Sequence, residues 1–102
     1  MDLEEINELE RLAKEKILDW RQSLAGAKLL KAKHLYGEGE YLKAFSLLRE
    51  SRRILLGLQD CGRNVRGDIN EVDELFRKWA TEMRGLGIIL LPDMRMYVCL
   101  SY

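Results

Sequence analysis

The residue types that most often carry chemistry are few and scattered in this 102-residue chain. His34 is the one histidine, and the carboxylate of Glu38 follows it four residues later. Cys61 and Cys99 lie 38 positions apart, which suits neither a disulfide scaffold nor a metal cluster. No glycine-rich loop of a phosphate-binding type occurs. These residues predict a protein without enzymatic activity, cofactor or metal, in a reducing, cytoplasmic compartment.

Acidic residues near the N-terminus offer one catalytic alternative. Glu4, Glu5 and Glu8 match the Glu-Glu-x-x-Glu spacing, so this segment resembles that of all-α nucleotide pyrophosphatases, in which carboxylates one turn apart hold Mg²⁺. That family also needs Glu-x-x-Asp on the following helix, whereas Glu15 and Asp19 are four apart on the same helix. We therefore expect the three glutamates to form a solvated first turn, and a metal-dependent nucleotide hydrolase remains an alternative.

Basic side chains are concentrated in the middle of the chain. Residues 21–66 carry a net charge of +6, against −4 for residues 1–20 and −2 for residues 67–102. Such a distribution favours pairing with a second copy or with a charged partner. It also predicts, as an alternative function, a face that binds phosphates and therefore nucleic acid. The candidate contacts are Lys28, Lys31, Arg49, Arg52, Arg53, Arg63 and Arg66.

Two observations weigh against nucleic acid as the main ligand. The isoelectric point of the whole chain is only about 6.6. No aromatic residues are interleaved with the basic residues in a pattern that would stack on bases.

The composition predicts one soluble domain. Hydrophobic residues at 47% and charged residues at 33% exclude a disordered chain, and the length permits a single core. The longest uncharged run, residues 85–92, is far shorter than the ~20 residues of a membrane span. The acidic start predicts that a secretory signal is absent. We therefore expect no membrane contact.

An apolar stripe at helical spacing predicts a first helix over residues 2–36, either continuous or broken near residues 23–26. Trp20, on this stripe, is expected to pack in the core. The stripe consists of Leu9, Ala13, Ile17, Trp20, Leu24 and Ala27.

Glycines and caps predict the remaining elements. Gly37 and Gly39 predict a stop and a tight reversal, followed by a second helix over residues 40–58. Asp68 and Glu71 have the form of a capping box ahead of a third helix over residues 69–84, on which Trp79 is expected to be buried.

The apolar tail, residues 86–102, is predicted to be either a small hairpin turning at Pro92-Asp93 or an extended strip, with Cys99 as a buried thiol. The whole pattern predicts an all-α fold, an antiparallel bundle of three or four helices in one domain over residues 1–102.

The predicted helices differ in length. An unbroken first helix would span about 50 Å, against about 28 Å and about 24 Å for the second and third. Helices bury apolar stripes only beside partners of matching length, so the first helix either breaks or finds a partner in another chain. The complementary charges of the acidic N-terminus and the basic middle favour a homodimer.

The most specific feature is the hairpin segment around residues 27–58. Ala32 and Ala44 permit close backbone approach, Gly39 makes the turn, and Tyr41 can fold its ring across the junction. This segment resembles the helical hairpin of tetratricopeptide repeats and of microtubule-interacting-and-trafficking domains. It is also similar to the hairpin of a small uncharacterised archaeal helical family, in which a later Gly-Leu, here Gly57-Leu58, follows the turn.

The departures from a tetratricopeptide repeat are Lys28 in place of the first large aromatic, Ser51 in place of a later Ala and Leu56 in place of the terminal Pro. No second copy lies 34 residues away, which excludes a stacked array. What the resemblance implies is peptide or protein binding in a groove between helices. The prediction for function is therefore a small helical protein-interaction module, with a protein partner or a second copy of itself.

Overall fold

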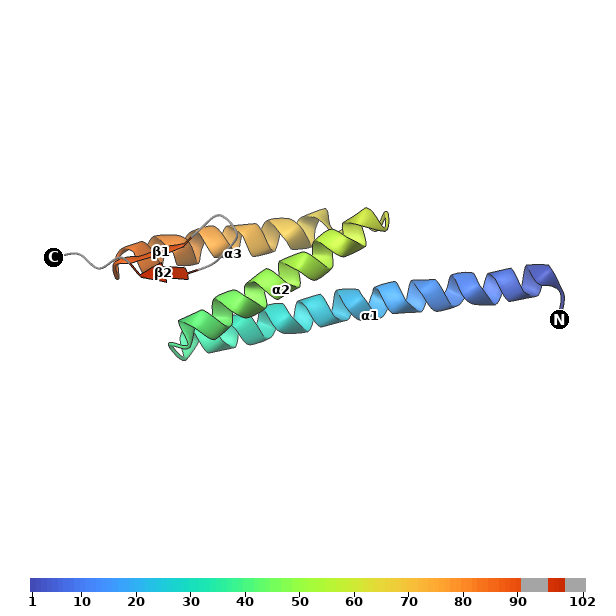
Figure 1. The fold of residues 1–102 in the computed structure, drawn as a ribbon, viewed down its shortest axis with the longest axis horizontal. Coiled ribbons are helices and arrows are strands. Elements are labelled where there is room, and N and C mark those ends of the chain that lie inside the picture. The colour runs from blue at the N-terminus through green and yellow to red at the C-terminus, as the bar shows by residue number, and fades with distance from the viewer. Residues whose placement is uncertain (91–95, 99–102) are drawn as a thin grey trace.

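The computed structural model describes residues 1–90 and 96–98 and shows an all-α fold of three helices followed by two short paired strands (Figure 1). Successive helices run antiparallel, and α2 packs against both of the others. The molecule is elongated, 72 × 23 × 19 Å. The elements are α1 (Leu3–Gly37), α2 (Tyr41–Asp60), α3 (Arg66–Arg84), β1 (Ile88–Leu90) and β2 (Met96–Val98).

The length of α1 dominates the shape. Because α1 has 35 residues and α2 has 20, the N-terminal half of α1 runs past the end of α2 as a single helix (Figure 1). α1 is continuous through residues 23–26, so the four-helix alternative is wrong. A side chain at Gly26 would meet nothing within 4 Å, and one glycine in a long run of good helix formers is tolerated.

Both helix-to-helix turns use the same device. Gly39 adopts φ 83°, and the amide of Glu40 donates to the carbonyl of Leu35 at 2.9 Å. At the end of α2, Gly62 adopts φ 87°, and the amide of Arg63 donates to the carbonyl of Leu58 at 3.1 Å. These are Schellman closures, in which a left-handed residue lets otherwise unpaired carbonyls find donors.

The hairpin of α1 and α2 is held by small residues. Ala32 and Ala44 are completely buried, as their spacing around the turn predicts. Ser51 is also completely buried, and its hydroxyl donates to the carbonyl of Ala25 at 2.8 Å. A hydroxyl that bonds to the facing backbone fits a close helix–helix contact without an unsatisfied polar group.

An aromatic cluster fixes α3 onto this hairpin. The rings of Tyr36 and Trp79 stack with centroids 4.1 Å apart, and the ring of Phe45 packs edge-on against Trp79 at 5.5 Å. Tyr41 folds back to within 5.1 Å of Tyr36, across the turn. Because these rings come from all three helices, the cluster sets the position of α3 relative to the hairpin.

The start of α3 differs from the prediction. The helix begins at Arg66, with Val65 as N-cap and no side-chain hydrogen bond to the cap. Asp68 therefore lies inside the first turn, where its charge favours the helix dipole, and the predicted capping box is wrong. Val65 is buried, so packing at this position replaces the cap that Asp68 would have made.

β1 pairs antiparallel with β2, with Ile88 opposite Val98 and Leu90 opposite Met96. The predicted turn at Pro92-Asp93 and the predicted burial of Cys99 lie outside the described residues. None of the described helices has the length and apolar character needed to cross a membrane.

The turn at Gly39 yields a matched pair of substitutions. Gly39→Ala should lower the free energy of unfolding by about 1–2 kcal/mol, because alanine resists the left-handed conformation although its Cβ would meet nothing within 4 Å. Gly37→Ala, two residues earlier and still helical, should leave stability unchanged or raise it by about 0.5–1 kcal/mol. Urea unfolding followed by circular dichroism measures both; equal effects would contradict the assignment of the strain to Gly39.

Tyr36 yields a prediction about pH. Burial, and donation of its hydroxyl to the carboxylate of Glu82, raise the pKa of Tyr36 well above its ordinary value of about 10. The neutral phenol therefore contributes stability that is fully present below about pH 10 and is lost as the pH rises through the higher folded-state pKa.

An ultraviolet titration of the phenols should show one late ionisation that Tyr36→Phe removes. Glu82→Gln should move that step partway to lower pH, because burial remains. A late step that persists in Tyr36→Phe would contradict this account.

Candidate interaction surface

The half of α1 that projects beyond α2 carries an uncovered row of apolar side chains. We call it the N-terminal stripe, and it consists of Ile6, Leu9, Ala13, Ile17 and Trp20. All five are exposed, and the exposed fractions of Ile17 and Trp20 are 50% and 64%. Monomeric proteins seldom leave a contiguous row of large apolar side chains in water. The prediction that Trp20 packs in the core of the chain is wrong.

The N-terminal stripe is distinct from the face of α1 that packs on α2. The buried residues of α1 are Ala25, Leu29 and Ala32, all in its second half. At about 100° per residue, the stripe is centred roughly 135° around the helix from the side that faces α2. The predicted stripe is therefore the face of α1 that α2 does not cover: of its six residues only Leu24 is half-buried, and Ala27 is exposed.

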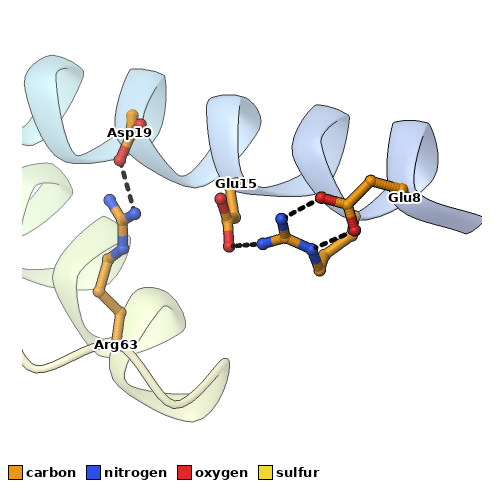
Figure 2. A network of polar contacts seen from close by, with 5 residues as sticks. Glu8, Glu15, Asp19 and Arg63 are labelled. Carbon is orange, nitrogen blue, oxygen red and sulfur yellow. Dashed lines mark hydrogen bonds and ion pairs between the residues drawn. The ribbon is translucent and has the colours of Figure 1, made fainter.

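Charged residues occupy the opposite side of the projecting helix. Arg11 bonds to the carboxylates of Glu8 and Glu15, one turn to either side (Figure 2). The hydrogen bond from Arg11 lowers the pKa of Glu8, and the same contact raises the pKa of Arg11. At three and four residues' spacing such pairs support a helix that has no neighbour. The projecting segment is thus amphipathic, with a charged side and an apolar side.

Contacts from Arg63 to two side chains of α1, which we call the clasp, mark where α1 leaves the bundle. The guanidinium of Arg63, from the turn after α2, contacts the carboxylate of Asp19 at 2.5 Å (Figure 2). It also donates to the side-chain oxygen of Gln22 at 3.0 Å. Within the described residues, no side chain of α1 before Leu18 is buried or half-buried. The stripe therefore lies almost wholly outside the intramolecular core.

The structure draws three of the seven predicted phosphate-binding residues into contacts between elements. Lys28 pairs with Glu50 at 2.8 Å, Arg52 with Asp73 at 2.8 Å, and Arg63 with Asp19. The hydrogen bond from Lys28 lowers the pKa of Glu50. Each of these pairs joins two different helices or a helix and a turn, so these three basic residues have a structural role.

The other four, Lys31, Arg49, Arg53 and Arg66, form no ion pair in the part of the chain that the structure describes. Lys31 lies on α1, Arg49 and Arg53 on α2, and Arg66 at the start of α3. With three of its members neutralised by carboxylates, the basic face is weaker than the sequence suggests. Nucleic-acid binding stays a prediction.

A groove of about 520 Å³ lies where the three helices diverge. Its floor contains Ala25, Leu29 and Leu55, and its rim carries the carboxylates of Asp68 and Glu71. The resemblance to microtubule-interacting-and-trafficking domains implies a groove of this kind. The groove has three apolar side chains on its floor and an acidic rim, whereas the N-terminal stripe consists of five apolar side chains.

Residues with catalytic potential are dispersed. Glu4 and Glu5 are exposed on the first turn of α1, and Glu8 is engaged by Arg11. His34 is exposed and lies 3.9 Å from the carboxylate of Glu38. Among residues 1–90 and 96–98, no three histidine, cysteine or acidic side chains gather in a way that could hold a metal ion.

Sequence reasoning missed the contacts that join distant segments. Nothing in the spacing of Lys28 and Glu50, or of Tyr36 and Trp79, signals that they meet. The exposed position of Trp20 had one available signal, the excess length of the first helix.

Comparison with known proteins gives no relative: no family model, no curated protein and no solved structure matches this chain.

The Arg63 clasp yields a prediction about stability. Arg63→Ala should lower the free energy of unfolding by about 1 kcal/mol, because it removes a half-buried guanidinium that bonds to two side chains of α1. Arg66→Ala, an exposed arginine three residues later, should change it by less than about 0.5 kcal/mol. Chemical denaturation at low and high salt measures both effects, and equal losses for the two variants would contradict the clasp.

Proposed function

We propose that this protein is a non-enzymatic, small helical protein-interaction module, and that its docking surface is the N-terminal stripe of α1. The observation that carries the proposal is the exposure of this row of apolar side chains on a helix with no neighbour. A partner helix laid along the stripe would remove these side chains from water, at roughly 25 cal/mol per Å² of apolar surface. Helix-on-helix recognition of this kind uses anchors at three- and four-residue spacing.

Trp20, the largest side chain of the stripe, is the natural main anchor of such a surface. Large aromatic side chains dominate the energetics of protein interfaces, and Trp20 is 64% exposed on the free chain. The charged residues beside the stripe would then set the orientation of the partner more than the affinity. The expected partner is a second copy or another protein, and the proposal includes a cytoplasmic location, supported by the exposed free thiol of Cys61.

A pair of double variants tests the proposal. Ile17→Glu with Trp20→Glu should abolish partner binding while circular dichroism stays unchanged, because both side chains lie outside the core. The matched control is Leu30→Glu with Leu42→Glu, which alters two leucines of similar exposure, 67% and 70%, away from the stripe.

Binding is measured by using each variant as bait in native extract and by light scattering of the purified chain. We expect the stripe variant alone to lose the associated protein. Equal loss with the control variant would contradict the assignment of the stripe as the docking surface.

A further inference from the structure

The N-terminal stripe continues beyond the clasp. Leu24 is half-buried and Ala27 is exposed, and both lie in line with Trp20 at helical spacing. We call the combined row the seam. It runs from Ile6 to Ala27, about 32 Å along the axis of α1, and consists of Ile6, Leu9, Ala13, Ile17, Trp20, Leu24 and Ala27.

We propose that the seam is the interface of a homodimer in which the α1 helices of two copies of this chain pack antiparallel, with the two-fold axis passing between residues 16 and 17. This inference rests on the proposed function and names its partner and geometry. A two-fold axis brings the same patch of both copies together, so the patch must be complementary to itself.

The order of side chains along the seam meets that requirement. With the axis between residues 16 and 17, two residues lie opposite each other across the interface when their numbers add up to 33. Leu9 then faces Leu24 of the second copy, Ala13 faces Trp20, and Ile6 faces Ala27. A small side chain meets a large one at two of these three levels, which is the alternation that lets two helices pack 8–10 Å apart.

The charges follow the same symmetry. The antiparallel register lays residues 1–16, with net charge −3, along residues 17–32 of the second copy, with net charge +2. Asp2 falls opposite Lys31, at both ends of the interface. Glu10 and Arg21 lie on one edge of the seam, and each is diagonally across from the other in the second copy.

In a parallel, in-register pair, each acidic residue would instead lie at the same level as the same residue of the second copy. The two −4 segments, residues 1–20, would then lie together, which is unfavourable. Lys16 is the charged residue nearest the axis. It lies at the edge of the seam, where its aliphatic stem can cover Ile17 of the second copy while its ammonium group reaches water.

The rest of the molecule leaves room for this arrangement. The seam is roughly 135° around α1 from the side that packs on α2, so neither α2 nor α3 stands between the two α1 helices. Residues 2–31 of each copy overlap over about 45 Å, and the N-terminal half of each α1 runs along the part of the other copy's α1 that packs on α2. The half of α1 that projects beyond its own bundle (Figure 1) thereby acquires a neighbour of equal length.

Charge reversal at Glu10 and Arg21 tests both the partner and the direction. Sedimentation velocity on the full chain should give a mass of about twice 11.9 kDa for the wild type. Glu10→Arg alone, or Arg21→Glu alone, converts two attractive contacts across the axis into two repulsive ones and should weaken the dimer about tenfold. The double variant restores both attractions and should restore the wild-type dissociation constant.

A parallel dimer gives a different pattern, because each edge of the seam then faces the other edge of the second copy. Glu10 would lie near Glu5 of the second copy and Arg21 near Lys16. Both contacts join like charges, so neither single variant should weaken a parallel dimer. Equal dissociation constants for the wild type and both single variants would therefore overturn the antiparallel register. Arg77→Glu, an exposed reversal on α3, is the control and should leave the dimer unchanged.

Failure of this inference is distinguishable from failure of the proposed function. A wild-type chain that sediments at 11.9 kDa at every concentration overturns the homodimer. The interaction module then stands if the Ile17→Glu, Trp20→Glu variant still loses a partner protein that the wild type binds. If the Ile17→Glu, Trp20→Glu variant still sediments as a dimer, both the proposed dimer interface and the proposed docking surface are overturned.

Discussion

A helix can bury an apolar face only along the length over which another helix lies beside it, and this constraint governs the molecule. α2 covers the second half of α1, where Ala25, Leu29 and Ala32 form a close contact sealed by the hydroxyl of Ser51. Beyond the clasp between Arg63 and Asp19 the first half of α1 has no neighbour. The two glycine turns and the aromatic cluster hold together a bundle that is shorter than α1, its longest helix.

The local features of this fold could be predicted from the sequence. The all-α class follows from helical periodicity, and the reversal at Gly39 follows from a residue that adopts a left-handed conformation without a Cβ penalty. The burial of Ala32 and Ala44 follows from their positions on either side of that turn. Each of these depends on residues close together in sequence, whose geometry is fixed by one helix or one turn.

The errors arose where tertiary contacts decide. Trp20 and Ala25 both lie on helical spacings in α1, and only the direction from which α2 approaches makes Ala25 buried and Trp20 exposed. The capping box at Asp68 failed because Val65, buried against the core, allows α3 to begin one turn earlier. Periodicity identifies an apolar face but does not say which partner covers it.

The two apolar faces of α1 also separate folding from association. The bundle is complete without the seam. In its core, Phe45 and Leu48 from α2 and Trp79 from α3 pack with buried residues from the second half of α1. The first half of α1 is held as a helix by Asp2, whose carboxylate accepts from the amide of Glu5 at 2.9 Å, and by the ion pairs of Arg11. Such a helix is formed before a partner arrives, so binding need not provide the conformational entropy of ordering it. The exposed stripe is thus preorganised for a second helix.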